Sequence, residues 1–125
     1  MGVSTPRLLT TGAALVVEDN VIVAHDIIAQ LEELGAKTVL TAYRRDDVGA
    51  ILSSTTISVA VLDYHFSGGT IEPVADVLIK RNIPFIIASG VAKTQDLPAR
   101  LRAIPLIVKP FVADDIRHAL ERLPD

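Results

Sequence analysis

The sequence predicts an α/β fold built on a doubly wound, five-stranded parallel sheet. Five short apolar runs, each followed by an amphipathic segment, indicate five successive strand–helix units. The runs consist mainly of Val, Ile, Leu and Ala with little polar alternation, which is typical of parallel strands buried on both faces. Right-handed crossovers place helices on both faces, and the usual strand order for five such units is 2-1-3-4-5.

Local patterns predict the elements in chain order. The predicted strands are the apolar runs at 13–17, 37–41, 57–62, 85–88 and 106–108. Asn20 is suited to cap the first helix, and Gly35 is suited to end it as its C′ residue. Apolar residues at helical spacing predict the later helices around 48–52, 73–78, 95–103 and 114–123, with a turn at 67–69. The helix at 95–103 requires Pro98 in its first turn, where proline is tolerated.

The composition excludes several classes of function. The 125 residues make one ordinary domain, and because aromatic residues are only 4% the core must be aliphatic. A net charge of −3 gives no support to a nucleic-acid partner. The absence of cysteine excludes disulfides, thiolate metal sites and a cysteine nucleophile, and it fits a reducing compartment. No apolar run approaches the roughly 20 residues of a membrane helix. We therefore expect a cytoplasmic protein without direct nucleic-acid or membrane partners.

Polar residues that could carry chemistry follow four of the five predicted strands. The first strand is followed by Glu18 and Asp19, the third by Asp63, the fourth by Ser89 and the fifth by Lys109. Ligands of such sheets bind outside the carboxyl ends of the strands, at the switch point between the first and third. Three carboxylates there repel one another unless a cation joins them, and hard oxygen ligands favour Mg²⁺. With a hydroxyl and an ammonium group opposite, the pattern predicts a seat for a phosphoryl group.

Taken singly, each of these residues has an ordinary structural explanation. An Asp after a strand is commonly a turn or capping residue, and a Ser at a strand end often forms a turn. An acidic pair before a helix favours the helix dipole without any further role. The functional hypothesis therefore depends on four independent placements at one edge of one sheet.

At these residues the chain resembles the receiver domains of two-component response regulators. The resemblance covers roughly residues 12–123 and is carried by the segments LVVEDN (15–20), VAVLDYH (59–65), PFIIASG (84–90) and IVKPF (107–111). It implies a flavodoxin-like receiver fold, with residues 1–11 as a short N-terminal arm and 12–125 as the receiver domain. The segment PFIIASG also resembles the PFxFATGY stretch of a subfamily of stand-alone alphaproteobacterial receivers.

The resemblance implies a metal site at the acidic residues. Asp63 matches the aspartate that receives the phosphoryl group and also ligates the metal. Glu18 and Asp19 match the acidic pair that holds Mg²⁺, with Mn²⁺ as an alternative, and Asp19 is the more direct ligand. His65 matches the position whose backbone carbonyl completes the metal shell.

The same resemblance assigns the residues that contact the phosphoryl group. Ser89 matches the hydroxyl residue that turns toward the phosphoryl oxygens, and Lys109 matches the lysine that pairs with them. The Lys109–Pro110 peptide bond is usually cis in this family. Leu106 stands where the family usually has an aromatic switch residue. We therefore expect coupling through Ser89 and the loop at 90–94, while Leu106 stays packed against the last helix.

The predicted function is that of a stand-alone receiver rather than an enzyme. A sensor histidine kinase or phosphotransfer protein donates the phosphoryl group to Asp63, and the signal passes to a protein target whose identity the sequence does not give. The expected state is a monomer or weak dimer. The alternative is a phosphorylation-independent pseudo-receiver, which only the Leu106 substitution favours. A haloacid-dehalogenase-type hydrolase would need an Asp where His65 stands, and the chain has no P-loop motif.

Overall fold

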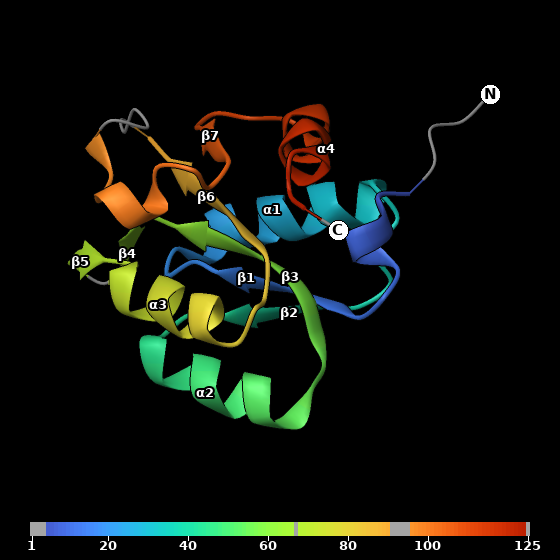
Figure 1. Cartoon of the computed structure of the whole chain (residues 1–125). Coiled ribbons are helices and arrows are strands. Elements are labelled where there is room, and N and C mark those ends of the chain that lie inside the picture. Colours follow the sequence, from blue (N-terminus) through green and yellow to red (C-terminus); the bar gives the residue numbers. More distant parts are fainter. Residues whose placement is uncertain (1–4, 67, 91–95, 125) are drawn as a thin grey trace.

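The computed structural model describes residues 5–66, 68–90 and 96–124. Its centre is a five-stranded parallel sheet in the order β2-β1-β3-β6-β7 (Figure 1). The strands are β1 (Ala13–Val17), β2 (Val39–Ala42), β3 (Ile57–Asp63), β6 (Phe85–Ser89) and β7 (Leu106–Val108). Since β6 and β7 are the fourth and fifth strands of this sheet, the order is the predicted 2-1-3-4-5. The predicted α/β, flavodoxin-like fold is confirmed.

In the described residues, four α-helices cover the two faces of the sheet. They are α1 (Val21–Glu33), α2 (Arg45–Ser54), α3 (Glu72–Lys80) and α4 (Ala113–Glu121). Figure 1 shows α1 and α4 on one side of the sheet and α2 and α3 on the other. The buried residues form two apolar clusters accordingly, one under α2 and α3 and one under α1 and α4. In the described part of the chain, no helix is long and apolar enough to cross a membrane.

The first helix begins and ends where its sequence predicts. The Asn20 side chain accepts hydrogen bonds from the amides of Ile22 (2.9 Å) and Val23 (3.1 Å), which satisfies two otherwise unpaired donors of the first turn. Gly35 follows the helix with a φ of 109°, a conformation that favours glycine. These two signals fix how the chain leaves β1 and returns to β2.

The fourth predicted helix, at 95–103, is wrong for the residues that the structure describes. Ala99–Leu101 form only a short 3-10 helix, η3, with Pro98 as its N-cap. Position 95 lies outside the described residues. Proline disfavours helical geometry at the residue before it, so Leu97 does not extend the turn backwards. Leu97 and Leu101 are nevertheless 1% and 0% exposed, so burial of two leucines, rather than helix propensity, anchors this segment.

The N-terminal segment contributes to packing. Arg7–Leu9 form a 3-10 helix, and Leu9 is buried in the cluster under α1 and α4. The Ser58 hydroxyl donates a hydrogen bond to the Leu8 carbonyl, which fastens this segment to β3. The division into an arm at 1–11 and a domain from residue 12 stays a prediction.

A small hairpin follows β3, which the sequence indicated only as a turn. Its strands are β4 (His65–Phe66) and β5 (Gly69–Thr70), paired antiparallel. Ser67, part of the predicted turn, lies outside the described residues. The hairpin therefore begins one residue after Tyr64 and places the backbone directly beside the carboxyl end of β3.

Candidate functional site at the carboxyl edge of the sheet

Polar side chains gather where the parallel strands end. Asp63 is the last residue of β3 and Ser89 the last of β6, while Glu18 and Lys109 directly follow β1 and β7. The strand register pairs Asp63 with Ala88 and Ser89 with Val108, so these ends are level with one another. Hence residues far apart in the sequence meet at one edge, at the switch point between β1 and β3.

Lys109 bridges two buried carboxylates. Its Nζ lies 3.1 Å from Asp63 Oδ1 and 3.3 Å from Glu18 Oε1. Glu18 is 1% and Asp63 6% exposed, whereas the Lys109 side chain is 28% exposed. The backbone amide of Lys109 also donates to the Ser89 carbonyl at 2.8 Å, which holds the base of the side chain against β6. The following Lys109–Pro110 peptide bond is cis, as the resemblance implies.

Burial and neighbouring charges shift the pKa values of Glu18 and Lys109. Burial raises the pKa of Glu18 to about 7; the Asn20 amide, 3.2 Å from Glu18 Oε2, opposes the shift, and the Asp63 carboxylate adds to it. Burial alone would lower the pKa of Lys109, but the facing carboxylates of Asp63 and Glu18 outweigh it and the net shift is upward. Lys109 is therefore held as a cation between two groups that compete for it.

Asp19 completes an acidic cluster that fits a cation. Carboxylate oxygens of Glu18, Asp19 and Asp63 all lie within 4.8 Å of one another. Glu18 and Asp63 are buried, whereas Asp19 is exposed and faces solvent. This donor set contains only oxygen, which suits a hard, partly hydrated cation such as Mg²⁺ and does not favour zinc. The described residues therefore could hold a metal in the place that the sequence predicts.

The remaining predicted site residues lie around this cluster. Ser89 is fully buried at the end of β6. His65 lies in β4 with an exposed side chain, and its ring meets that of Tyr64 edge to face with centroids 5.2 Å apart. The roles of the Ser89 hydroxyl and of the His65 backbone carbonyl stay predictions. The loop at 90–94, expected to move on activation, lies outside the described residues except for Gly90.

Leu106 packs on the α2 and α3 side of the sheet edge, and not in the cluster under α4 where it was expected from the sequence. It pairs with Ile87 in the sheet and is a partly buried neighbour of the cluster under α2 and α3. It also borders a surface hollow together with Ala119 and Arg122, at and just after the end of α4. Whether it keeps one rotamer during signalling stays a prediction.

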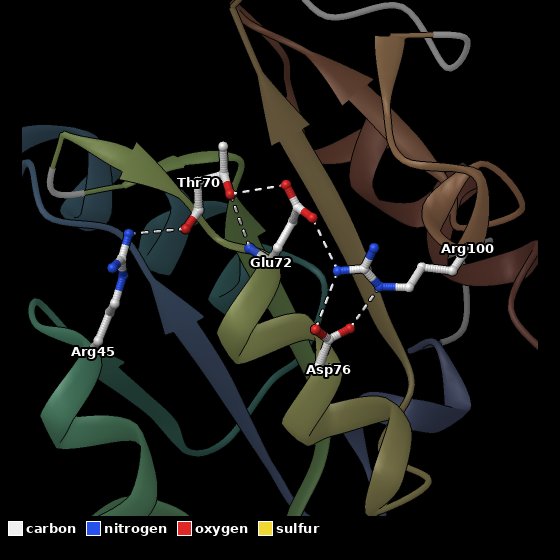
Figure 2. Close-up of polar contacts among 5 residues, drawn as sticks. All are labelled: Arg45, Thr70, Glu72, Asp76 and Arg100. Carbon is white, nitrogen blue, oxygen red and sulfur yellow. Dashed lines mark hydrogen bonds and ion pairs between the residues drawn. The ribbon is translucent and has the colours of Figure 1, made fainter.

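A polar network that the sequence analysis missed surrounds the hairpin (Figure 2). The Arg100 guanidinium, from η3, binds Asp76 through two hydrogen bonds of 2.8 and 3.1 Å and Glu72 at 2.9 Å. Glu72 Oε2 accepts from the Thr70 hydroxyl at 3.1 Å. Arg45, from α2, donates to the Thr70 carbonyl. The spacing of Glu72 and Asp76 by one helical turn was the only local signal.

Tyr64 links this network to Asp63. It directly follows Asp63 and is 8% exposed. Burial raises the pKa of Tyr64, and the charge of Glu72 together with a hydrogen bond to it adds to the shift. The chain on either side of Asp63 is thus held by the core on one side and by the Glu72 network on the other.

Comparison with solved structures gives close structural matches. The solution structure of SdrG from Sphingomonas melonis Fr1 is 32% identical, covers 88% of this chain and 93% of its own, and has a TM-score of 0.75. The BeF₃-activated conformation of SdrG from Pseudomonas melonis Fr1 is 33% identical over the same shares, also with a TM-score of 0.75.

A more distant match is the PhyR stress response regulator, which is 24% identical with a TM-score of 0.74. It matches 92% of this chain but only 46% of its own, and this likeness bears on the fold alone. No family model matches the chain. No curated protein matches it either.

Proposed function

This chain belongs to the response-regulator receiver family, and we propose that it acts as a signalling phosphoacceptor with Asp63 as the site of modification. One observation carries the proposal: Lys109 and the acidic cluster meet Asp63 at the carboxyl edge of the sheet. A nucleophilic carboxylate, a cation site and a fixed ammonium group are the components that phosphoryl transfer requires.

The proposed reaction is a transfer from a phosphohistidine. An oxygen of the Asp63 carboxylate bonds to phosphorus as the phosphorus–nitrogen bond of the donor breaks, and the bonding pair returns to the imidazole nitrogen. Lys109, 3.1 Å from Asp63 Oδ1, offsets negative charge on the transferred group. Water later attacks the phosphorus, which releases inorganic phosphate and regenerates the carboxylate. The protein contributes position and electrostatics.

The metal we propose is Mg²⁺, with Mn²⁺ as an alternative. Asp19 and Asp63 would hold it directly, Glu18 through water, and the His65 backbone carbonyl would complete the protein ligands. When bound, the metal supplies positive charge to the phosphoryl oxygens. The donor chemistry supports this assignment, because all of these groups offer oxygen.

The proposed partners are proteins. A sensor histidine kinase or phosphotransfer protein supplies the phosphoryl group in the cytoplasm, and a protein target reads the modified state, with Ser89 turned toward the phosphoryl oxygens. The segment PFIIASG supports assignment to the stand-alone PFxFATGY receivers. That SdrG has a BeF₃-activated conformation supports a response to phosphoryl mimics in a relative of similar size. We expect a monomer or weak dimer.

A direct test uses the chain alone. Incubation with acetyl phosphate and Mg²⁺, followed by intact mass measurement, is expected to show the addition of one phosphoryl group. The labelled species should be lost on treatment with hydroxylamine, which cleaves acyl phosphates. A folded chain that acquires no label with either Mg²⁺ or Mn²⁺ would instead favour the pseudo-receiver alternative, for which Leu106 is the one supporting feature.

The two acidic residues after β1 are expected to differ in importance. Asp19→Asn should weaken Mg²⁺ binding about tenfold, because an exposed carboxylate can join a hydrated cation directly. Glu18→Gln should have a smaller effect, because Glu18 is 1% exposed and already engaged by Lys109 and the Asn20 amide. Titration of each variant with Mg²⁺, followed by amide chemical shifts, measures the difference. The reverse order would contradict the assignment of Asp19 as direct ligand.

A further inference from the structure

The first residue of α2 reaches across to the hairpin that follows Asp63. The Nη2 atom of Arg45 donates hydrogen bonds to the carbonyls of Phe66, at 3.2 Å, and Thr70, at 2.9 Å. Phe66 belongs to β4 and Thr70 to β5, so one guanidinium nitrogen bridges both strands. Figure 2 shows the Arg45 side chain extending from α2 toward the Thr70 carbonyl.

The hairpin is short, and the buried Phe66 side chain and a few hydrogen bonds hold it. Each strand has only two residues, and an isolated two-stranded pair is marginally stable in water. Its base is closed by the Ile71 amide, which donates to the Tyr64 carbonyl at 2.8 Å. Thr70 is tied to α3 through Glu72. Arg45 supplies the attachment to α2. Its hydrogen bonds come from a positively charged donor, which makes them stronger than hydrogen bonds between neutral groups.

Gly69 leaves room for this contact. A Cβ atom at position 69 would lie 2.8 Å from Arg45 Nη2, so any side chain there would have to displace the guanidinium. Gly69 therefore permits the guanidinium to lie against the hairpin backbone. The contact can be perturbed from either side, by changing Arg45 or by adding one methyl group at Gly69, which displaces the guanidinium.

We propose that Arg45 is a positioning residue for the metal site: by bridging the Phe66 and Thr70 carbonyls it holds the hairpin so that the neighbouring His65 carbonyl faces the acidic cluster. The inference rests on the proposed function, because it assigns the His65 carbonyl to the metal. Arg45 itself contacts neither metal nor phosphoryl group. Its effect passes through the backbone of β4, one residue beyond Tyr64.

The direction of the change in Mg²⁺ affinity in Arg45→Ala distinguishes a positioning role from a purely electrostatic one. Arg45 is a cation near an acidic site, so removing its charge would by itself strengthen the binding of Mg²⁺. A loosened His65 carbonyl does the opposite, and loss of a group that orients a metal ligand typically costs tenfold or more in affinity. Arg45→Ala is therefore expected to weaken Mg²⁺ binding about tenfold.

Three further variants sharpen the test. Arg44→Ala is the matched control, because Arg44 precedes Arg45, carries the same charge and makes no side-chain hydrogen bond to the described hairpin residues. It should change the Mg²⁺ affinity less than about twofold, since exposed charges are screened by salt. Gly69→Ala should weaken binding with no change of charge. Arg45→Lys, which keeps a cation able to donate to both carbonyls, should restore part of the affinity.

The readouts are amide chemical shifts during Mg²⁺ titration and hydrogen exchange of the Ile71 amide without metal. Arg45→Ala and Gly69→Ala should both weaken Mg²⁺ binding and speed Ile71 exchange, while Arg44→Ala should leave both near the wild-type values. One result would overturn this inference and leave the proposed function intact. In it, the wild-type chain binds Mg²⁺ and is labelled, while Arg45→Ala binds Mg²⁺ equally well or more tightly. Failure of the wild-type chain to bind Mg²⁺ or accept a phosphoryl group would overturn the proposed function. In that case, unchanged Ile71 exchange in Arg45→Ala would independently show that Arg45 does not hold the hairpin.

Discussion

Asp63→Asn is expected to abolish Mg²⁺-dependent phosphoryl labelling of this chain. The asparagine side chain has the same shape and keeps an oxygen that can accept a hydrogen bond from Lys109. In the wild-type chain, Lys109 Nζ lies 3.1 Å from Asp63 Oδ1. A neutral amide oxygen is a far weaker nucleophile than a carboxylate, and it also loses the negative charge that a metal requires. Intact mass after incubation with acetyl phosphate and Mg²⁺ measures the effect, which should be complete rather than partial.

A matched control distinguishes loss of the acceptor from loss of one acidic residue. Asp46 lies in the first turn of α2 with an exposed side chain and is not part of the acidic cluster. Asp46→Asn removes the same charge and should label like the wild-type chain. Circular dichroism of both variants checks that the fold is retained. Labelling of Asp63→Asn at the wild-type level would show that another residue accepts the phosphoryl group.

The position of Asp63 could be predicted from sequence because a simple rule governs it. The β-branched run before it must be a buried strand, and parallel strands end together at the edge where ligands bind. The same rule located Glu18, Ser89 and Lys109. What these residues share is direct attachment to a strand, so predicting the sheet was sufficient to predict their meeting.

The parts that sequence did not predict depend on contacts between distant segments. Arg100 and Glu72 are 28 positions apart, and no local pattern pairs them. The segment around Pro98 has apolar residues at near-helical spacing, yet the structure uses Leu97 and Leu101 as two separate anchors in the core. Tertiary burial decided its conformation over local propensity. The contact of Arg45 with the hairpin could not be predicted either, because an arginine at a helix start usually faces solvent.

Lys109→Met is expected to impair both stability and labelling. The methionine keeps much of the length and apolar stem but leaves the Glu18 and Asp63 carboxylates facing each other without a cation. A buried polar group left unpaired costs about 1–3 kcal/mol, so the free energy of unfolding should fall by roughly that amount in metal-free buffer. Loss of one charge-stabilising donor also typically slows such chemistry on the order of 10²-fold or more. Urea unfolding and the rate of mass increase with acetyl phosphate measure the two effects.

Added Mg²⁺ should restore the stability of Lys109→Met far more than its rate of labelling. A divalent cation at the acidic cluster offsets the repulsion that Lys109 normally relieves, so added Mg²⁺ should stabilise Lys109→Met more than the wild-type chain. It cannot replace an ammonium group on the opposite side of the phosphoryl oxygens, so labelling should stay slow. Lys37→Met is the control, because Lys37 is exposed just before β2, at the opposite edge of the sheet. If Mg²⁺ stabilised the two variants equally, the buried carboxylates would not be the groups that Lys109 compensates.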